Sequence, residues 1–264
     1  MGSSERWLAD LSRLLASPSY CRSLGGGAWK VTVKDRDLVV KVGPGVKDEA
    51  DGLSSLGRVP QAPPVPEVVM CEAGILVTSW VDQRARTARH EEALGRMLAG
   101  LHSAGWAQWG GGSSWIGACQ VSASVEPDSA SFYRARLAEL ASQCGLEQAL
   151  SAVVAKIEDL LPPGGPALVH GDLWWGNVLW GADGRPWLID PSVHGGHPEE
   201  DLAMLALFGA LPDRLISAYC EVSPLHAGWQ ERLALFQLYP LLVHTVLFGG
   251  AYRFQVEAIA HRFA

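Results

Sequence analysis

The sequence predicts an α+β fold of two lobes, with a small β-rich N-terminal lobe and a larger helical C-terminal lobe. Short apolar runs bounded by glycine or proline, a pattern typical of strands, are concentrated in residues 1–80. Beyond them, apolar residues recur mainly at spacings of three and four, which favours helices. The chain has 264 residues, 48% hydrophobic and 19% charged, so it can bury a sizeable core. We expect lobes over 1–80 and 81–264, a hinge at about 79–82, and a ligand cleft between the lobes.

The predicted N-terminal lobe begins with an amphipathic helix and continues as strands around a second helix. Trp7, Leu8 and Leu11 give the first helix its apolar face. The expected elements are a helix at 5–16, the loop Gly25-Gly26-Gly27, strands at 31–33 and 38–42, a helix at 46–56, a proline-rich connector at 59–66, and strands at 67–70 and 75–80.

The predicted C-terminal lobe is mostly helical. The expected elements are helices at 89–101, 129–143 and 146–160, a glycine-rich loop at 110–117, a Pro-Gly break at 162–166, two short strands, and helices to the C-terminus. The segment 233–252 is nearly apolar enough for a membrane span. Gln237, Pro240 and His244 interrupt it, and a span needs about 18 apolar residues. We therefore expect a buried core helix there.

Charge and cysteine content narrow the partners and the compartment. The chain has 21 Lys and Arg against 28 Asp and Glu, a net charge of −7, and no basic stripe, which argues against nucleic acid as a partner. The five cysteines are scattered and never spaced as CxxC, which favours reduced thiols in a cytoplasmic protein. Glu5 and Asp10 stand where a secretory signal would be apolar. We expect no membrane partner, and the oligomeric state is left open.

The most informative segment is residues 167–191. It contains His170-Gly171-Asp172, then Asn177 five residues after Asp172, then Asp190. Asp183-Gly184 between two apolar runs predicts a hairpin, and a two-residue turn would place Asn177 directly opposite Asp190. Opposed side chains lie roughly 4.5–5.5 Å apart at Cβ, so an amide and a carboxylate oxygen would converge. Such hard oxygen ligands suit Mg²⁺.

This spacing matches the catalytic loop of kinases, so the sequence predicts a protein-kinase-like bilobal fold that uses ATP and Mg²⁺. In such a loop, Asp172 would accept the proton of a substrate hydroxyl. Asn177 and Asp190 would hold the metal that bridges the ATP phosphates. The alternative is a polar turn in which Asp172 merely caps a helix. The preceding His-Gly and the second aspartate at the far end of the hairpin favour the kinase interpretation.

Upstream residues occur in the order that this interpretation requires. Gly25, Gly26 and Gly27 would cover the phosphates, Lys41 would bind them from a strand, and Glu49 would pair with Lys41 from the next helix. The backbone C=O of Ser79 and N–H of Val81 at the hinge could bind adenine. A glycine run is otherwise an ordinary loop, and a strand lysine is otherwise solvated, so only the combination of these residues in this order supports the kinase interpretation.

Missing features favour a small-molecule kinase. Position 171 is glycine instead of the arginine of regulated protein kinases, and only ten residues separate Asp190 from Asp201. There is no Ala-Pro-Glu element, so control by an activation loop is not expected.

The chain resembles the fructosamine kinase (ketosamine-3-kinase) family, which is related to aminoglycoside and choline kinases. The resemblance is carried by HGDLWWGN and LIDPSVHGGHPEEDLAMLALFG, and by LHSAGW and SFYRARL outside the site. It implies ATP-dependent phosphorylation of the 3-hydroxyl of a ketosamine, a glycated amine, in deglycation repair. It also implies Asp172 as the base, Asn177 and Asp190 as metal ligands, and Lys41 with Glu49 as the phosphate-binding pair.

Some residues depart from the family pattern, and some are expected to lie near the substrate. The loop reads Gly-Gly-Gly-Ala-Trp where relatives often have Gly-Gly-Ser-Ile, and Trp175 replaces a usually small residue. Trp174 and Trp175 could form an apolar wall for the substrate or simply pack in the core. His197 is grouped with the substrate-side residues. His194 and His197 are spaced as a metal pair might be, but no cysteine or further histidine supports a zinc site. Asp201 is grouped with these residues but is expected chiefly to brace the catalytic loop.

Three functions remain open at this stage. The first is a ketosamine kinase. The second is a kinase of the same fold that acts on an aminoglycoside or another hydroxylated amine, motivated by the altered glycine loop and Trp175. The third is a nucleotide-binding pseudokinase that acts as a partner protein. The intact acidic and amide ligands argue against the third.

Overall fold

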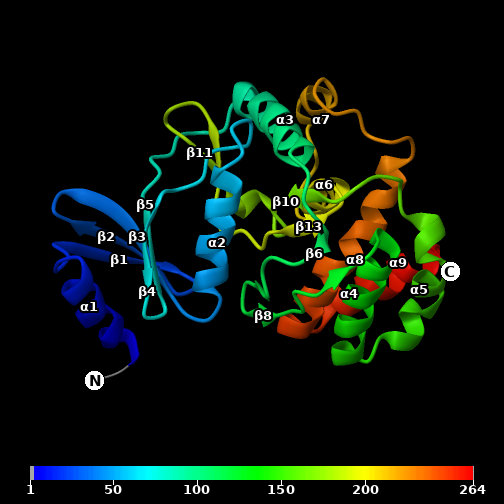
Figure 1. The fold of residues 1–264 in the computed structure, drawn as a ribbon, viewed down its shortest axis with the longest axis horizontal. Helices are drawn as coiled ribbons and strands as arrows, with labels where there is room; N and C mark the ends of the chain where they lie inside the picture. The colour runs from blue at the N-terminus through cyan, green and yellow to red at the C-terminus, as the bar shows by residue number, and fades with distance from the viewer. Residues whose placement is uncertain (1–2, 264) are drawn as a thin grey trace.

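The computed structural model describes residues 3–263, with side chains from Trp7 onward. Met1 and Gly2, part of the segment in which no secretory signal is expected, lie outside the described residues, as does Ala264. Figure 1 shows two lobes, a sheet with two helices and a larger bundle of helices. The expected α+β, protein-kinase-like arrangement is confirmed.

The N-terminal lobe is a five-stranded antiparallel sheet in the order β1-β2-β3-β5-β4. The helix α1 packs on one face and α2 on the other (Figure 1). The elements are α1 (Ser3–Leu14), β1 (Tyr20–Gly25), β2 (Ala28–Val33), β3 (Arg36–Val42), α2 (Val46–Gly57), β4 (Val68–Glu72) and β5 (Ile75–Ser79).

Strand alternation decides which side chains face the cleft. In β5, Ile75 and Val77 belong to the cluster under α1, whereas Leu76 packs against α2. In β3, Val40 joins the α1 side, so its neighbour Lys41 points to the α2 side, where the cleft lies. Because successive side chains of a strand point to opposite faces, Lys41 points into the cleft.

The first strand, β1, was not expected from the sequence. All six of its residues are exposed, so it carries no alternating apolar pattern. It is an edge strand held by its pairing with β2. Trp29 ends the Gly-Gly-Gly-Ala-Trp segment that departs from the family pattern. It packs against Trp7 of α1, with ring centroids 4.7 Å apart. The bulky residue at this position thus attaches α1 to the sheet.

The C-terminal lobe contains two buried clusters. One lies among α4, α5, α8 and α9, and the other among α3, α6, α7 and the short strands. Its helices are α3 (Ala88–Ser103), α4 (Ser129–Cys144), α5 (Glu147–Leu160), α6 (Glu199–Leu207), α7 (Asp213–Cys220), α8 (Trp229–Phe248) and α9 (Ala251–Arg262). Its strands are β6 (Trp109–Gly110), β7 (Trp115–Ile116), β8 (Cys119–Gln120), β9 (Val125–Glu126), β10 (Ala167–Val169), β11 (Val178–Trp180), β12 (Pro186–Leu188) and β13 (His194–Gly196), and a 3₁₀ turn, η1, covers Trp175–Asn177.

The apolar segment 233–252 is part of the core, as expected, but it is not one helix. The helix α8 ends at Phe248, and Gly249 and Gly250 at φ 62° and 59° turn the chain into α9. Ten residues of α8 are buried, which explains why its sequence is apolar on every side. No helix within residues 3–263 is long and apolar enough to cross a membrane.

The glycine-rich segment after α3 holds four two-residue strands that periodicity could not reveal. β6 pairs with β13 and β9, and this places the segment beside the catalytic loop. Gly112 lies against the backbone of Val193 so closely that a side chain there would collide with it. Close backbone contact, and not flexibility, explains this glycine.

Candidate active site

The hairpin of β11 and β12 differs by one residue from the expected register. Val178 pairs with Leu188, and the turn contains three residues, Ala182–Gly184, because Gly181 and Arg185 close it with a 2.9 Å hydrogen bond. Asn177 therefore lies opposite Ile189, whose N–H donates to its carbonyl at 3.1 Å.

Asp190 lies one position beyond the expected pairing, yet it still reaches the cleft. Its backbone is left-handed, with φ 58°, and this redirects the side chain after the strand ends. Asp190 and Asn177 line the same cavity. Both residues therefore line one cavity, and Asp190 reaches it through its backbone conformation and not through direct cross-strand pairing with Asn177.

Two hydrogen bonds of the His170 ring hold the catalytic loop in place. The ring Nε2 of His170 lies 2.9 Å from the carbonyl of Ile189, and Nδ1 accepts the N–H of Asp172 at 3.3 Å. Burial lowers the pKa of His170, so the ring is neutral, with Nε2–H as the donor. One histidine thus positions the backbone next to both Asp172 and Asp190.

Asp201 is a buried brace for this loop. Its carboxylate accepts the N–H groups of His170 at 2.8 Å and Gly171 at 3.0 Å. His102 from α3 contacts it at 3.2 Å and also contacts the Tyr219 hydroxyl at 2.8 Å. Burial alone would raise the pKa of Asp201, but the hydrogen bond and charge of His102 hold it below its usual range. Asp201 does not line the cleft.

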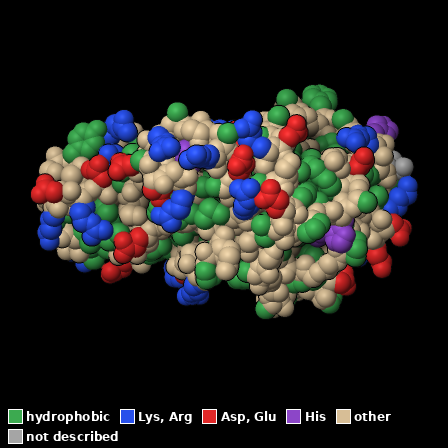
Figure 2. Space-filling view, turned by 90° about the horizontal axis from the view of Figure 1, so that it is seen from above, with side chains coloured by type: hydrophobic (Ala, Val, Ile, Leu, Met, Phe, Trp, Pro, Cys, Tyr) green, Lys and Arg blue, Asp and Glu red, His purple; other side chains and the backbone are tan. Residues whose placement is uncertain are grey.

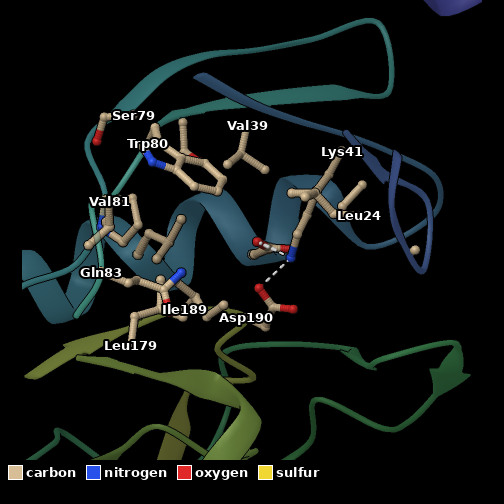
Figure 3. Close-up of a pocket in the computed structure, with 16 residues that line it drawn as sticks. Leu24, Val39, Lys41, Ser79, Trp80, Val81, Gln83, Leu179, Ile189 and Asp190 are labelled. Atoms are coloured by element: carbon tan, nitrogen blue, oxygen red, sulfur yellow. Dashed lines mark hydrogen bonds and ion pairs between the residues drawn. The ribbon is translucent and has the colours of Figure 1, made fainter. Parts of the chain in front are cut away.

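Lys41, Glu49 and Asp190 form one ion-paired group. The Lys41 ammonium donates to Glu49 Oε1 at 2.8 Å and to Asp190 Oδ1. Figure 3 shows the lysine reaching from β3 toward the aspartate. Burial alone would lower the pKa of Lys41, but the charges of Asp190 and Glu49 outweigh it and raise the pKa. Burial raises the pKa of Glu49, against the charge of Lys41.

The oxygen atoms around Asn177 fit a hard divalent cation. The side-chain nitrogen of Asn177 donates to the carbonyl of Asp172 at 2.8 Å, which leaves Oδ1 available. Asp190 uses Oδ1 for Lys41, and within the described part of the chain no donor occupies its Oδ2. Within residues 3–263 no three or more His, Cys, Asp or Glu side chains are grouped so that they could hold a metal ion by themselves. A cation held here would therefore also need oxygens from phosphates or water.

Asp172 lies in an unusual electrostatic environment. Burial, together with the charge of Asp190, raises the pKa of Asp172 to about 8, against the hydrogen bond from Asn177 and the charge of Lys41. A cation between Asn177 and Asp190 would offset the negative charge of Asp190, which is the second cause of the raised pKa of Asp172. Raised carboxyl pKa values of this kind are typical of functional sites.

Three hollows meet along the cleft. The hinge cavity, of about 280 Å³, lies between Val39 and Trp80 of the N-terminal lobe and Leu179 and Ile189 of the hairpin, with Lys41 at its inner end (Figure 3). The central cavity, of about 240 Å³, is lined by Gly26, Gly27, Lys41, Glu49, Asp172, Asn177 and Asp190, among others. The aromatic groove, of about 700 Å³, is lined by Ile116, Gly117, Ala118, Asp172, Trp174, Trp175, Met204, Phe208, Val243, His244, Leu247, Phe248 and Tyr252.

The hollows share walls, so they form one path. The hinge and central cavities share Lys41, Glu49 and Asp190, and the central cavity and the aromatic groove share Gly117, Asp172 and Trp174. Asp172 thus lies between the second hollow and the third. The glycine loop covers the first two, with Gly25 on the hinge cavity and Gly26 and Gly27 on the central one.

The two tryptophans of the catalytic loop have different surroundings. Trp174 is 41% exposed and contacts Phe208 edge-on with centroids 6.2 Å apart. Trp175 is half-buried, stacks under the Arg86 guanidinium at 4.3 Å from the ring centroid, and packs near Trp180. Both line the aromatic groove, and Trp175 also packs against the hairpin.

His197 is not brought to the cleft, which corrects its placement near the substrate. It is buried, stacked on Phe236 at 5.3 Å, and it borders a separate hollow with Pro163 and His226. Its N–H donates to Glu200 at 2.7 Å, within a buried network that also contains Arg136.

Some residues of the site carried no clear sequence signal. Asp48 of α2 and Ser114 of the glycine-rich segment hydrogen-bond across the lobes. His102, which braces Asp201, lies within the motif LHSAGW, but the motif alone indicates no role for it. Only a contact between elements far apart in sequence reveals these roles.

Comparison with known proteins agrees with this geometry. The fructosamine kinase family profile matches residues 24–263. A probable ketoamine kinase from Enterococcus faecium is 31% identical over 255 residues, which cover 89% of this chain and 90% of the relative. A candidate fructosamine-3-kinase from Thermobifida fusca, solved by crystallography, is 35% identical, covers 97% of both chains and has a TM-score of 0.84.

More distant structures share the fold alone. The ADP-bound aminoglycoside phosphotransferase APH(2'')-Ib is 14% identical with a TM-score of 0.65, and the match covers 98% of this chain and 97% of its own. The family profile matches the sequence itself over nearly the whole chain, including the catalytic loop, the hairpin and most residues of the aromatic groove. The chain therefore belongs to the fructosamine kinase family and is an ATP-dependent phosphotransferase.

Proposed function

We propose that the protein transfers the γ-phosphoryl group of ATP to the 3-hydroxyl of a ketosamine, as a deglycating kinase. The observation that carries the proposal is the position of Asp172, at the junction between the cavity that holds Lys41, Asn177 and Asp190 and a groove large enough for an acceptor. Family membership supports a glycated amine as that acceptor.

ATP fits the path with its base in the hinge cavity. The Val81 N–H has no protein acceptor within residues 3–263, so it is free for adenine, and Ser79 lies beside it at the proposed hinge, 79–82. Val39 and Trp80 above and Leu179 and Ile189 below form apolar walls for a flat base (Figure 3). The glycine loop then lies over the phosphates.

Asn177 and Asp190 would hold Mg²⁺ in the central cavity, and Lys41, positioned by Glu49, would bind phosphate oxygens. When bound, the metal supplies charge neutralisation on the phosphates. Asp172 would orient the acceptor hydroxyl and accept its proton while the acceptor oxygen bonds to the γ-phosphorus and the bond to ADP breaks. Positioning and charge neutralisation then account for most of the rate.

The cytoplasm is the proposed location. All five cysteines are unpaired in the structure, which suits a reducing compartment.

A coupled assay of ATP consumption tests the function. Fructosyl-lysine and ribulosyl-lysine should be phosphorylated, and the free amines should not. A panel of aminoglycosides serves as the competing arm. Preference for that panel, or tight ATP binding without turnover of any acceptor, would overturn the ketosamine assignment in favour of the second or third alternative.

A further inference from the structure

The aromatic groove is much larger than the cavity it adjoins. Its volume is about 700 Å³, against about 240 Å³ for the central cavity. It begins at Asp172, where the reacting hydroxyl would lie, and extends away from the nucleotide toward α8 and α9. An acceptor whose hydroxyl lies at Asp172 would therefore extend the rest of its structure into this groove.

A continuous series of rings lines the groove. Trp174 contacts Phe208 at 6.2 Å, Phe208 contacts His244 at 5.2 Å, and His244 contacts Phe248 at 5.7 Å and Tyr252 at 4.9 Å, all between ring centroids. Phe208 and Phe248 are 40% and 67% exposed, although large apolar side chains are normally covered. These exposed rings belong to a concave surface, and that is typical of a ligand site.

The groove offers little to a charged group. Among the described lining residues there is no lysine or arginine, and Asp172 is the only carboxylate. One of the two ring nitrogens of His244, Nδ1, lies 2.6 Å from the carbonyl of Pro240, so that nitrogen is already engaged within the helix. A carboxylate carried into the groove would thus lose hydration without gaining a cationic partner, which is costly.

Charged side chains elsewhere on the surface are mixed. Figure 2 shows lysine and arginine interspersed with aspartate and glutamate over the face that it presents. On this face the two signs of charge are mixed, so it offers no single-sign patch that would select a charged acceptor, and the groove lining is the feature considered for specificity.

We propose that the groove selects ketosamines whose amine carries an apolar or aromatic substituent, in preference to those that carry the charged backbone of a free amino acid. This inference rests on the proposed function, because it assigns the amine-bearing half of the acceptor to the groove. Trp174, Phe208 and Phe248 are then specificity-determining residues, since they would contact the substituent and not the transferred group.

The experiment compares acceptors that differ only in the substituent. Initial rates with ATP are measured for fructosyl-phenylethylamine, fructosyl-hexylamine, fructosyl-lysine and fructosyl-glycine. The first two should exceed fructosyl-glycine in kcat/KM on the order of tenfold, a usual range for discrimination by an apolar pocket. The gain should lie mainly in KM, because contacts remote from the reacting atoms bind ground state and transition state alike.

Two single substitutions make the test specific. Phe248→Ala should remove most of the preference for fructosyl-phenylethylamine and change fructosyl-glycine little. Phe254→Ala is the matched control, because Phe254 is 70% exposed on α9 but does not line the groove. Both side chains are exposed, so neither change should unfold the protein.

The outcomes separate the two proposals. If fructosyl amines are phosphorylated with equal kcat/KM, or if Phe248→Ala and Phe254→Ala behave alike, the specificity proposal is wrong and the proposed function stands. If no fructosyl amine is phosphorylated while ATP still binds, the proposed function fails, and the specificity proposal fails with it.

Discussion

Asp48 in α2 accepts two hydrogen bonds from Ser114, one from its backbone N–H at 2.7 Å and one from its hydroxyl at 2.6 Å. The two residues are 66 positions apart and belong to different lobes. Together with the Lys41–Asp190 ion pair, this contact connects the sheet lobe to the catalytic lobe across the cleft. We expect both contacts to help hold the lobes at their observed separation.

We expect Ser114→Ala to destabilise the protein by about 1.5–3 kcal/mol, because the charged carboxylate of Asp48 loses the hydrogen bond from the Ser114 hydroxyl. Asp48→Asn should cost a similar amount, and a double-mutant cycle should show coupling of about 0.5–3 kcal/mol in urea unfolding. Asp51→Asn on the same helix is the control, since its pair with Lys47 is exposed and should contribute little. Additive single effects would show that the contact does not connect the lobes energetically.

Asp172→Asn should lower kcat by about 10²–10⁴, the usual contribution of a general base. Asparagine keeps the shape but cannot accept the proton, so the KM for ATP and the melting temperature should change little. Asp159→Asn, at an exposed site on α5, is the control for a general effect of charge. Turnover close to that of the unchanged protein would show that Asp172 is not the base.

Lys41→Met should weaken productive ATP binding, because the partly buried cation between Glu49 and Asp190 is lost. A hydrogen bond to a charged group contributes about 1.5–3 kcal/mol, so kcat/KM for ATP should fall roughly 10- to 100-fold. Lys156→Met, at an exposed position of α5, should leave kcat/KM unchanged. An unaltered kcat/KM for ATP in the Lys41 variant would remove this residue from the proposed phosphate site.

Stability should fall with acidification partly through His197. Burial lowers the pKa of His197 from 6.5 to about 3, so between these values the unfolded chain binds a proton that the folded chain excludes. The free energy of unfolding is therefore not reduced by this group above pH 6.5, and it decreases as the pH falls from 6.5 toward 3. The slope from one such group is at most about 1.4 kcal/mol per pH unit.

The measurement for His197 is urea unfolding at several pH values between 6.5 and 4. His197→Gln should show a shallower loss of stability than the unchanged protein, while His261→Gln at an exposed site should show the same loss. Parallel curves for all three proteins would mean that the loss on acidification arises from other groups, such as Glu200. Burial alone would raise the pKa of Glu200, but the interactions with His194 and Arg136 outweigh it and lower the pKa to about 2.

Several features of the site follow from the sequence alone. The alternation of β3 and the position of α2 are local properties, so the pairing of Lys41 with Glu49 could be predicted from spacing and is observed at 2.8 Å. Asp172 and Asn177 are separated by one short loop, which leaves few alternatives for their mutual position. Residues close in sequence can be placed by local geometry.

The register of the hairpin shows where such prediction fails. The pair Asp183-Gly184 fits a two-residue turn, but the turn formed has three residues, closed by the bond between Gly181 and Arg185. Neighbouring backbone decides between these: Ala182 donates to Asp82 at 2.7 Å, and Leu188 donates to Pro64 at 2.9 Å. These tertiary bonds shift the register, and the left-handed Asp190 compensates for the shift.

By itself the sequence determined the two-lobed α+β fold, the chemistry of the catalytic loop and the lysine–glutamate pair, because each depends on periodicity or short spacing. Only the tertiary structure decided that Asp48 meets Ser114, that His197 lies away from the cleft, and that rings from the catalytic loop, α8 and α9 form one groove. These arrangements join segments tens of residues apart, and their relative position is set by how helices and strands pack, which no local pattern encodes.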